Sequence, residues 1–196
     1  GTGALSTDTQ GDRATAIGNS ALASQNFTSS LDNYNTAVGN LTGGSISTGI
    51  YNSMLGGLAG DALTDADYNV VMGFQALTTD TKGNRSTAIG FEALKTQNFT
   101  SSTDSHNTAI GNRAGALLTT GTSNTLLGSK AGEAVTSGTN NILIGEQAGS
   151  HSVNITTGQA NILIGDFTDS TASGTDNQIV MGYNVTAVGD GNFTFG

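Results

Sequence analysis

The sequence predicts an all-β fold, a parallel β-solenoid (β-roll) with about 17 residues and two short strands in each coil. Three observations carry this prediction. A five-residue motif ending in glycine recurs ten times along the chain. Most of these glycines recur at every seventeenth position, and the other intervals contain short insertions. The chain has no proline, as expected where each interior strand donates its N–H groups to the next coil.

The motif itself has the composition of a short strand. We number its positions one to five, ending at the glycine. Position two is Thr, Ser, Val or Ile, and positions three and four are apolar, a pattern that favours strands over helices. We expect the fourth-position residues to line the core or to face other copies of the chain: Ile17, Val38, Leu55, Met72, Ile89, Ile110, Leu127, Ile144, Ile164 and Met181.

Both faces of each predicted strand are apolar, because positions three and four point to opposite sides. One face can line the coil, and the other needs a cover, since soluble chains rarely leave a long apolar stripe in water. Small residues at position three, such as Ala16 and Ala37, favour close packing there between copies. We therefore expect a homo-oligomer. A single protomer that already enclosed its third-position side chains would overturn this expectation of a shared fibre, and the adhesive role with it.

Position one is Asn in seven of the ten motifs. Asn tolerates left-handed backbone and caps turns, and stacked Asn amides can form a hydrogen-bonded ladder.

The chain divides into a lead-in (1–13) that we expect to continue from a longer chain, ten coils (14–182), and a cap or final short coil (183–196). The segment that begins at Arg13 matches the segment that begins at Arg85, so four coils were duplicated as a block. Ten coils at the strand spacing of about 4.8 Å would make a rod of roughly 50 Å.

Composition excludes several function classes. Six Lys and Arg against fifteen Asp and Glu give a net charge of −9, which disfavours nucleic acid and anionic membrane partners. The absence of Cys excludes thiolate metal sites and a cysteine nucleophile. No apolar run approaches the roughly 20 residues that cross a bilayer, so we expect no membrane insertion, and nothing indicates a cofactor.

The segment ATAIGNSALAS (14–24) and the NTAIG-type motifs resemble the head repeats of trimeric autotransporter adhesins, the YadA-like β-roll. They also resemble the Asn-Thr-Ala-Ile-Gly repeats of bacteriophage tail fibres. The resemblance extends from Ala14 to about Gly182, although the period is longer than that of the adhesin heads. It implies a homotrimer of left-handed β-rolls, extracellular on a virion or bacterial surface, that contacts a cell-surface receptor or glycan.

Two insertions, Ala23–Tyr34 and Lys95–His106, are the best candidates for receptor contact, because insertions in repeat proteins form exposed loops. Both contain QNFTSS. The alternative for Phe27 and Phe99, which we favour, is that each ring plugs a widened coil, since an exposed Phe is unfavourable. The candidate contact residues are Asn26, Phe27, Tyr34, Asn98, Phe99 and His106.

Other clusters are weaker. Asp61, Asp65 and Asp67 could hold Ca²⁺, but their spacing fits no known calcium loop, and a solvated acidic loop is the better interpretation. Asp104-Ser105-His106 contains the residue types of a catalytic triad, but adjacent residues in an extended loop point apart. We therefore predict no enzymatic activity.

Two alternatives to an adhesive fibre stay open. One is a purely structural filament subunit. The other is an ice-binding solenoid, in which threonine hydroxyls form a regular array. The threonines considered for that array are Thr119, Thr120, Thr136, Thr156 and Thr157.

Overall fold

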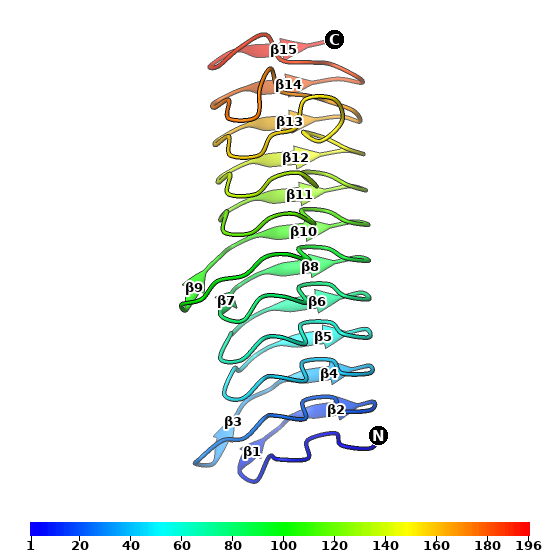
Figure 1. Ribbon diagram of the computed structural model, residues 1–196, viewed down its shortest axis with the longest axis vertical. Coiled ribbons are helices and arrows are strands. Elements are labelled where there is room, and N and C mark those ends of the chain that lie inside the picture. Colours follow the sequence, from blue (N-terminus) through cyan, green and yellow to red (C-terminus); the bar gives the residue numbers. More distant parts are fainter.

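The computed structural model describes residues 1–196 and shows one long stack of coils, with the two chain ends at opposite ends of the stack (Figure 1). The prediction of a parallel β-solenoid with the period of the motif glycines is confirmed. The structure contains no helix, and so none that is long and apolar enough to span a bilayer.

Eleven strands, one in each coil, form a single parallel sheet along the stack. Each motif position pairs with the same position in the next coil, so that Ala37, Met54 and Val71 are neighbours across the sheet. Phe193–Phe195 adds an eleventh strand beyond the ten motifs. In spatial order the strands are β2 (Thr15–Ile17), β4 (Thr36–Val38), β5 (Ser53–Leu55), β6 (Val70–Met72), β8 (Thr87–Ile89), β10 (Thr108–Ile110), β11 (Thr125–Leu127), β12 (Ile142–Ile144), β13 (Ile162–Ile164), β14 (Ile179–Met181) and β15 (Phe193–Phe195).

The prediction of two strands in every coil was wrong. The polar segments expected to be second strands, such as 117–121 and 134–138, are turns. They still bond from coil to coil, but several N–H groups converge on one carbonyl. Thr64 O, for example, accepts from the backbone of Ser47 (2.8 Å) and Thr48 (3.3 Å). Of 112 backbone hydrogen bonds, 22 lie within the strands, and the other 90 involve turns, loops or the ends of strands. Bonds beyond the strands therefore contribute substantially to the stack.

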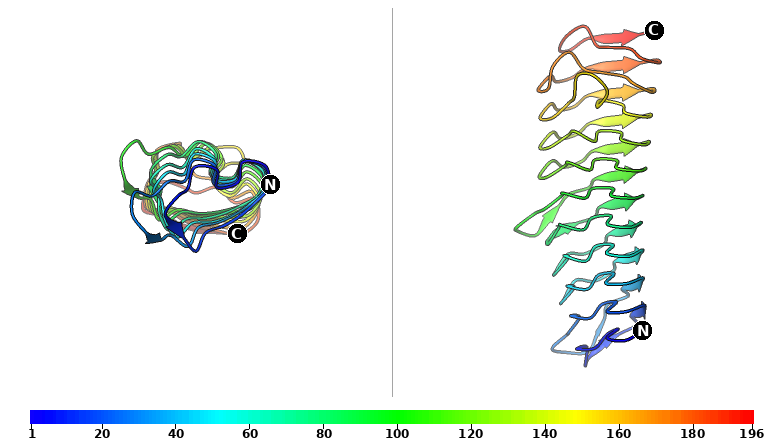
Figure 2. Two further views of the ribbon diagram at one scale, coloured as in Figure 1. Left: turned by 90° about the horizontal axis from the view of Figure 1, so that it is seen from below. Right: turned by 45° about the vertical axis from the view of Figure 1, so that its right-hand side comes forward.

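Four two-residue strands occur only where the chain carries its longer insertions. They are β1 (Gly11–Asp12) paired with β3 (Leu31–Asp32), and β7 (Gly83–Asn84) paired with β9 (Thr103–Asp104). Each pair supports one protruding loop. The two loops emerge on the same side of the stack, as Figure 1 and the end-on view in Figure 2 show.

The core is a narrow column enclosed by a single chain. From β4 to β14, every third-position side chain of the sheet is buried. Opposite them lie small residues such as Ala59 and Ala76 and larger ones such as Leu63 and Ile155, all fully buried. The expectation that the third position packs between copies of the chain was therefore wrong, because these side chains fill the interior of their own protomer.

The asparagine ladder is confirmed. Asn52 Nδ2 donates to Asn35 Oδ1 (3.3 Å), and Asn69 Nδ2 donates to Asn52 Oδ1 (3.1 Å). Asn52 Nδ2 also donates to Ala66 O (2.8 Å), which closes the corner of the coil. We expected the Asn to adopt the left-handed backbone conformation at this corner. The residue before it does so instead, for example Tyr51 (φ 58°). The ladder is fully buried, so each amide needs these partners.

Candidate functional site

The widest exposed apolar surface is the outward side of the eleven-stranded sheet. We call it the outer face and define it as the second- and fourth-position residues of the eleven strands. The fourth-position residues named above lie on this face and not in the core, because they are exposed or half-buried: Leu55 is 46% and Leu127 43% exposed. Toward the C-terminal end the second position is aliphatic as well, as at Ile142 and Ile179.

No charged residue lies on the outer face. None of the ten motifs, nor the segment 192–196 that contains β15, includes an Asp, Glu, Lys or Arg. All the charge is therefore carried by the rest of the chain: the lead-in, the corners, the return limbs and the protruding loops. Soluble monomers rarely expose large contiguous apolar patches, and no charged side chain interrupts this face. A face of this kind is typical of a surface that is covered in the working protein.

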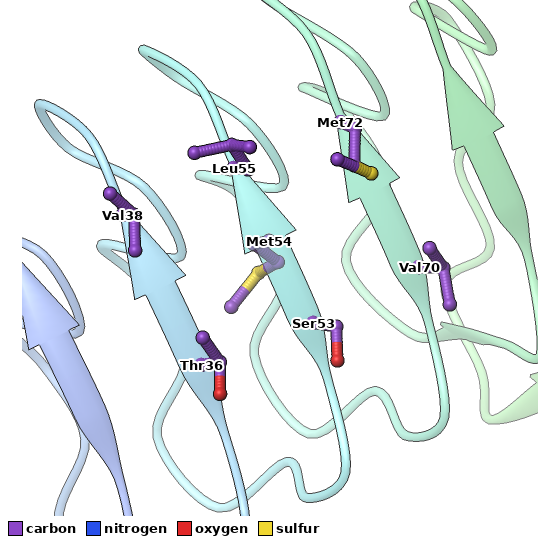
Figure 3. A pocket seen from close by; sticks show the side chains of 7 residues that line it. All are labelled: Thr36, Val38, Ser53, Met54, Leu55, Val70 and Met72. Carbon is purple, nitrogen blue, oxygen red and sulfur yellow. The ribbon is translucent and has the colours of Figure 1, made fainter.

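The outer face has a shallow depression of about 180 Å³ over β4, β5 and β6 (Figure 3). It lies between the two rows of side chains, where Ser53 is the smallest residue of its row. The fourth-position side of the depression is formed by Val38, Leu55 and Met72, and the second-position side by Thr36, Ser53 and Val70.

A column of stacked aromatic rings runs along the corner that precedes the sheet. Tyr34 and Tyr51 have ring centroids 5.5 Å apart, and Tyr51 and Tyr68 are 5.1 Å apart. The guanidinium of Arg13 covers Tyr34 and that of Arg85 covers Tyr68, at 5.3 and 4.8 Å from the ring centroids. The ring faces are thus occupied by one another or by Arg, so this tyrosine column cannot stack on a sugar ring. The three tyrosines occupy the same position of the repeat in three consecutive coils, a spacing of 17 residues that is visible in the sequence but was not among the predicted sites.

A second aromatic pair lies at the other edge of the outer face. Phe74 and Phe91 stack with centroids 6.0 Å apart and are 49% and 45% exposed. They follow the motif glycines of β6 and β8 directly. Together with the tyrosine column they widen the apolar surface over coils that also contain the depression.

The two insertions form the lateral loops, which we define as residues 26–32 and 98–104. Phe27 and Phe99 are buried (5% and 8% exposed), which agrees with the alternative that they plug widened coils rather than contact a receptor. Asn26 and Asn98 are exposed on the loops.

The two remaining candidate contact residues lie elsewhere. Tyr34 belongs to the tyrosine column, and His106 occupies the next corner beyond Arg85. The six candidate residues therefore do not converge on one site.

A buried network anchors each lateral loop. In the second loop, Asp80 Oδ1 accepts from the backbone of Gly83 (3.1 Å) and Phe99 (3.0 Å), and Asp80 Oδ2 accepts from Gln97 Nε2 (2.6 Å). Gln97 Oε1 in turn accepts from Asn107 Nδ2 (2.8 Å), which joins the loop to the asparagine ladder.

The first loop repeats the arrangement with Asp8, Gln25 and Asn35. Sequence reasoning missed this network, although Asp8 and Asp80 occupy equivalent places in the matching segments TDTQGDR and TDTKGNR.

The three aspartates proposed as a calcium alternative do not converge. Asp61 accepts from Thr78 Oγ1, Asp65 pairs with Lys82 Nζ (3.4 Å), and Asp67 Oδ1 accepts from the backbone N of Ile50 (2.8 Å). Burial raises the pKa of Asp67, against the lowering effect of its hydrogen bond to Ile50. No group of three or more His, Cys, Asp or Glu side chains is placed to hold a metal ion.

Two clusters combine Ser, His and Asp, and neither has the geometry of a catalytic triad. Ser105 is buried and its hydroxyl meets Ser86 Oγ (2.6 Å), whereas His106 is exposed.

In the second cluster, His151 Nδ1 lies 3.1 Å from Ser152 Oγ and 3.5 Å from Asp169 Oδ2. A triad needs the acid and the serine on different ring nitrogens, and here both approach the same one.

Comparison with protein-family models, with curated proteins and with solved structures finds no match to this chain.

Proposed function

We propose that this chain is a structural and adhesive segment of an extracellular homotrimeric fibre, of a bacteriophage tail fibre or a bacterial surface adhesin, that attaches to a cell surface. The observation that supports it best is the uncharged outer face, which runs along all eleven strands. The third-position side chains fill the protomer's own interior, and this overturns the fibre as it was argued from sequence, where that position was the contact between copies. The present proposal rests on the opposite face of the strands instead. The other face remains exposed and apolar, and identical copies of the chain are its proposed cover.

The geometry of the stack favours association along the whole rod. Every fourth-position side chain lies in register with the next, at the strand spacing of about 4.8 Å. A second copy aligned in the same direction would meet the same repeat at each coil. A cyclic arrangement of such copies closes the assembly. The number three comes from the resemblance to the trimeric fibres.

The association is tested by mass in solution. Sedimentation velocity at micromolar concentration is expected to give three times the chain mass. Leu55→Glu together with Leu127→Glu places charges on the outer face and is expected to give monomers. Thr120→Glu with Ser137→Glu is the matched control, because both residues lie on the return limbs, away from the outer face. A wild-type protein that is folded and monomeric would overturn the proposal.

Attachment is tested separately by adhesion. The protein, labelled with a fluorophore, is expected to bind the surface of host or target cells. It is also expected to compete for that surface with the intact phage fibre or with the bacterial cell that displays the adhesin. Stable trimers that bind no cells would instead favour the purely structural filament subunit.

Ice binding is a second candidate, because the outer face is uncharged and presents threonine hydroxyls beside aliphatic side chains. Thr15, Thr36 and Thr125 are exposed at the second position. Three of the five return-limb threonines first considered bond within the stack instead: Thr119 Oγ1 donates to Thr136 O (3.0 Å), Thr136 Oγ1 to Thr156 O (3.1 Å) and Thr156 Oγ1 to Ser173 O (3.4 Å). Thermal hysteresis at micromolar protein that is lost in Thr36→Leu with Thr125→Leu would favour this candidate over the fibre.

A further inference from the structure

The two lateral loops are equivalent structures at a fixed separation. Both contain QNFTSS, at 25–30 and 97–102, and both emerge on the same side of the stack (Figures 1 and 2). The coils that carry them belong to β2 and β8, which are four steps apart in the sheet. At the usual strand spacing this places the loops about 19 Å apart along the axis.

The base of each loop is held rigidly. The carboxylates of Asp8 and Asp80, together with the buried phenyl rings, leave no room for a side chain at Gly11 and Gly83. An added Cβ there would lie 2.8 and 2.9 Å from carbons of Phe27 and Phe99 and closer still to the carboxylate oxygens. The Asp–Gln–Asn network ties the loop to the buried ladder. On the return side Arg13 pairs with Asp32 (3.1 Å).

The second loop has the same tie, between Arg85 and Asp104 (3.1 Å). These two arginines are also the two ends of the tyrosine column, so one continuous stack connects the loops.

The exposed tips carry hydroxyl groups that the protein does not use. Thr28, Ser29, Thr100 and Ser101 are exposed, and their side chains make no hydrogen bond within the chain. The following serine in each loop is engaged, since Ser30 Oγ donates to Asp12 (2.7 Å). The four free side chains have no charge, and the neighbouring phenylalanines are buried.

We propose that the two lateral loops form one bivalent site for a neutral polysaccharide, contacted by the hydroxyls of Thr28, Ser29, Thr100 and Ser101. This inference rests on the proposed attachment function and names its ligand class. Hydroxyl groups both donate and accept, which complements the hydroxyls of sugars. The net charge of −9 disfavours anionic polymers.

Each tip offers few contacts and no stacking ring, so a single sugar segment binds weakly. A polymer that reaches both loops gains from the second contact, because that contact is intramolecular.

The first experiment compares the affinity of the protein for a polysaccharide with its affinity for short fragments of the same polysaccharide. The probes are neutral bacterial exopolysaccharides on a sensor surface and short oligosaccharides cut from them. Wild type is expected to bind one polymer about a hundredfold more tightly than its fragment. Thr28→Ala with Ser29→Ala is expected to lose about tenfold or more of polymer binding, and the four-residue variant with Thr100→Ala and Ser101→Ala to lose all of it. Thr120→Ala with Ser137→Ala is the control and is expected to bind as wild type.

The second experiment changes the separation of the loops. Deleting residues 52–68 joins Tyr51 to Asn69, keeps every strand in register, and brings the loops about 5 Å closer. Deleting residues 125–141 removes an equally long coil outside the loops and is the matched control. Polymer binding is expected to fall at least tenfold in the first deletion and to stay unchanged in the second. Both proteins are checked for trimer mass and a cooperative melt.

The outcomes separate this inference from the proposed function. Wild type that attaches to cells while the four-residue variant attaches equally well overturns the loop site and leaves the fibre proposal standing. Binding only to anionic polysaccharide or to a protein receptor overturns the neutral-glycan assignment. If the two deletions change polymer binding equally, or if neither changes it, the claim that binding depends on the spacing of the loops is overturned. Wild type that attaches to no cell and no polymer overturns both proposals.

Discussion

The guanidinium of Arg85 lies 4.8 Å from the ring centroid of Tyr68, while its Nε pairs with Asp104 at 3.1 Å. One side chain therefore closes the tyrosine column and holds the return strand of a lateral loop. Exposed ion pairs contribute little by themselves, and this one is about half exposed. The stacking of Arg on the aromatic ring gives the pair a fixed geometry that an isolated surface pair lacks.

Tyr51→Ala is expected to lower stability by about 1–2 kcal/mol, because Tyr51 stacks on a ring at each side. Chemical denaturation followed by circular dichroism measures the change. Tyr183→Ala is the control: Tyr183 is 71% exposed and has a single edge contact, with Phe167, so its loss is expected to be smaller. Equal losses would show that the column adds nothing beyond ordinary contact.

The first coil contains a buried polar atom without a partner, and the duplicated coil shows how to satisfy it. Asn33 Nδ2 is buried and unpaired, whereas the equivalent Ser105 bonds to Ser86 and to the carbonyl of Asn84. Replacing Ala14 and Asn33 by serine transfers this arrangement and is expected to raise stability by about 1 kcal/mol or more. The reciprocal change, Ser86→Ala with Ser105→Asn, is expected to lower it. Melting temperatures that move in the same direction for both would contradict this account.

The motif glycines allow neighbouring coils to approach. Gly73 has φ +134°, and an added Cβ would lie 2.4 Å from the carbonyl oxygen of Gly90. Gly73→Ala is therefore expected to cost about 3 kcal/mol or to prevent folding. Gly57→Ala is the matched control, because its Cβ would meet the ring of Phe74 at an ordinary 3.5 Å. Soluble expression and the melting temperature of the two variants give the comparison.

Asp67 makes stability depend on pH. Its pKa in the folded chain is raised by burial above the ordinary 3.8, so the folded protein binds a proton more readily than the unfolded chain. Its contribution to stability is full below 3.8 and is lost as pH rises through the folded-state pKa. The nearby charges are Asp65 and Asp104, which raise the pKa, and Arg85, which lowers it.

Asp67→Asn removes this titration and keeps an oxygen for the N–H of Ile50. The variant is expected to be more stable than wild type at pH 7, and the difference is expected to vanish near pH 3. A difference in melting temperature that is the same at both values would refute the assignment.

The sequence determined the period, the parallel register and the buried amide ladder, because a regular repeat fixes which residues stack. It did not determine which side of the strand faces inward. Alternation alone leaves both choices open, and small residues such as Ala37 were interpreted as a contact between copies. Ala37, Leu126 and Leu143 all occupy this position and all are fully buried, so the position lies inside the coil whatever the size of its side chain.

The return limbs were also misjudged. Segments rich in Thr have strand propensity, but here consecutive N–H groups converge on one carbonyl and form turns. The equivalence of Phe27 and Phe99 was visible from sequence, whereas the network beneath them joins residues from different coils and appears only in three dimensions.

The duplication of the four-coil block has a genetic consequence. Unequal crossing-over between the two copies would add or remove four whole coils, and every remaining strand would keep its partner, because each motif position pairs only with itself. Each such event would change the length of the molecule by about 19 Å and its number of protrusions by one. Natural populations of this gene are therefore expected to differ in steps of that size rather than by scattered small insertions.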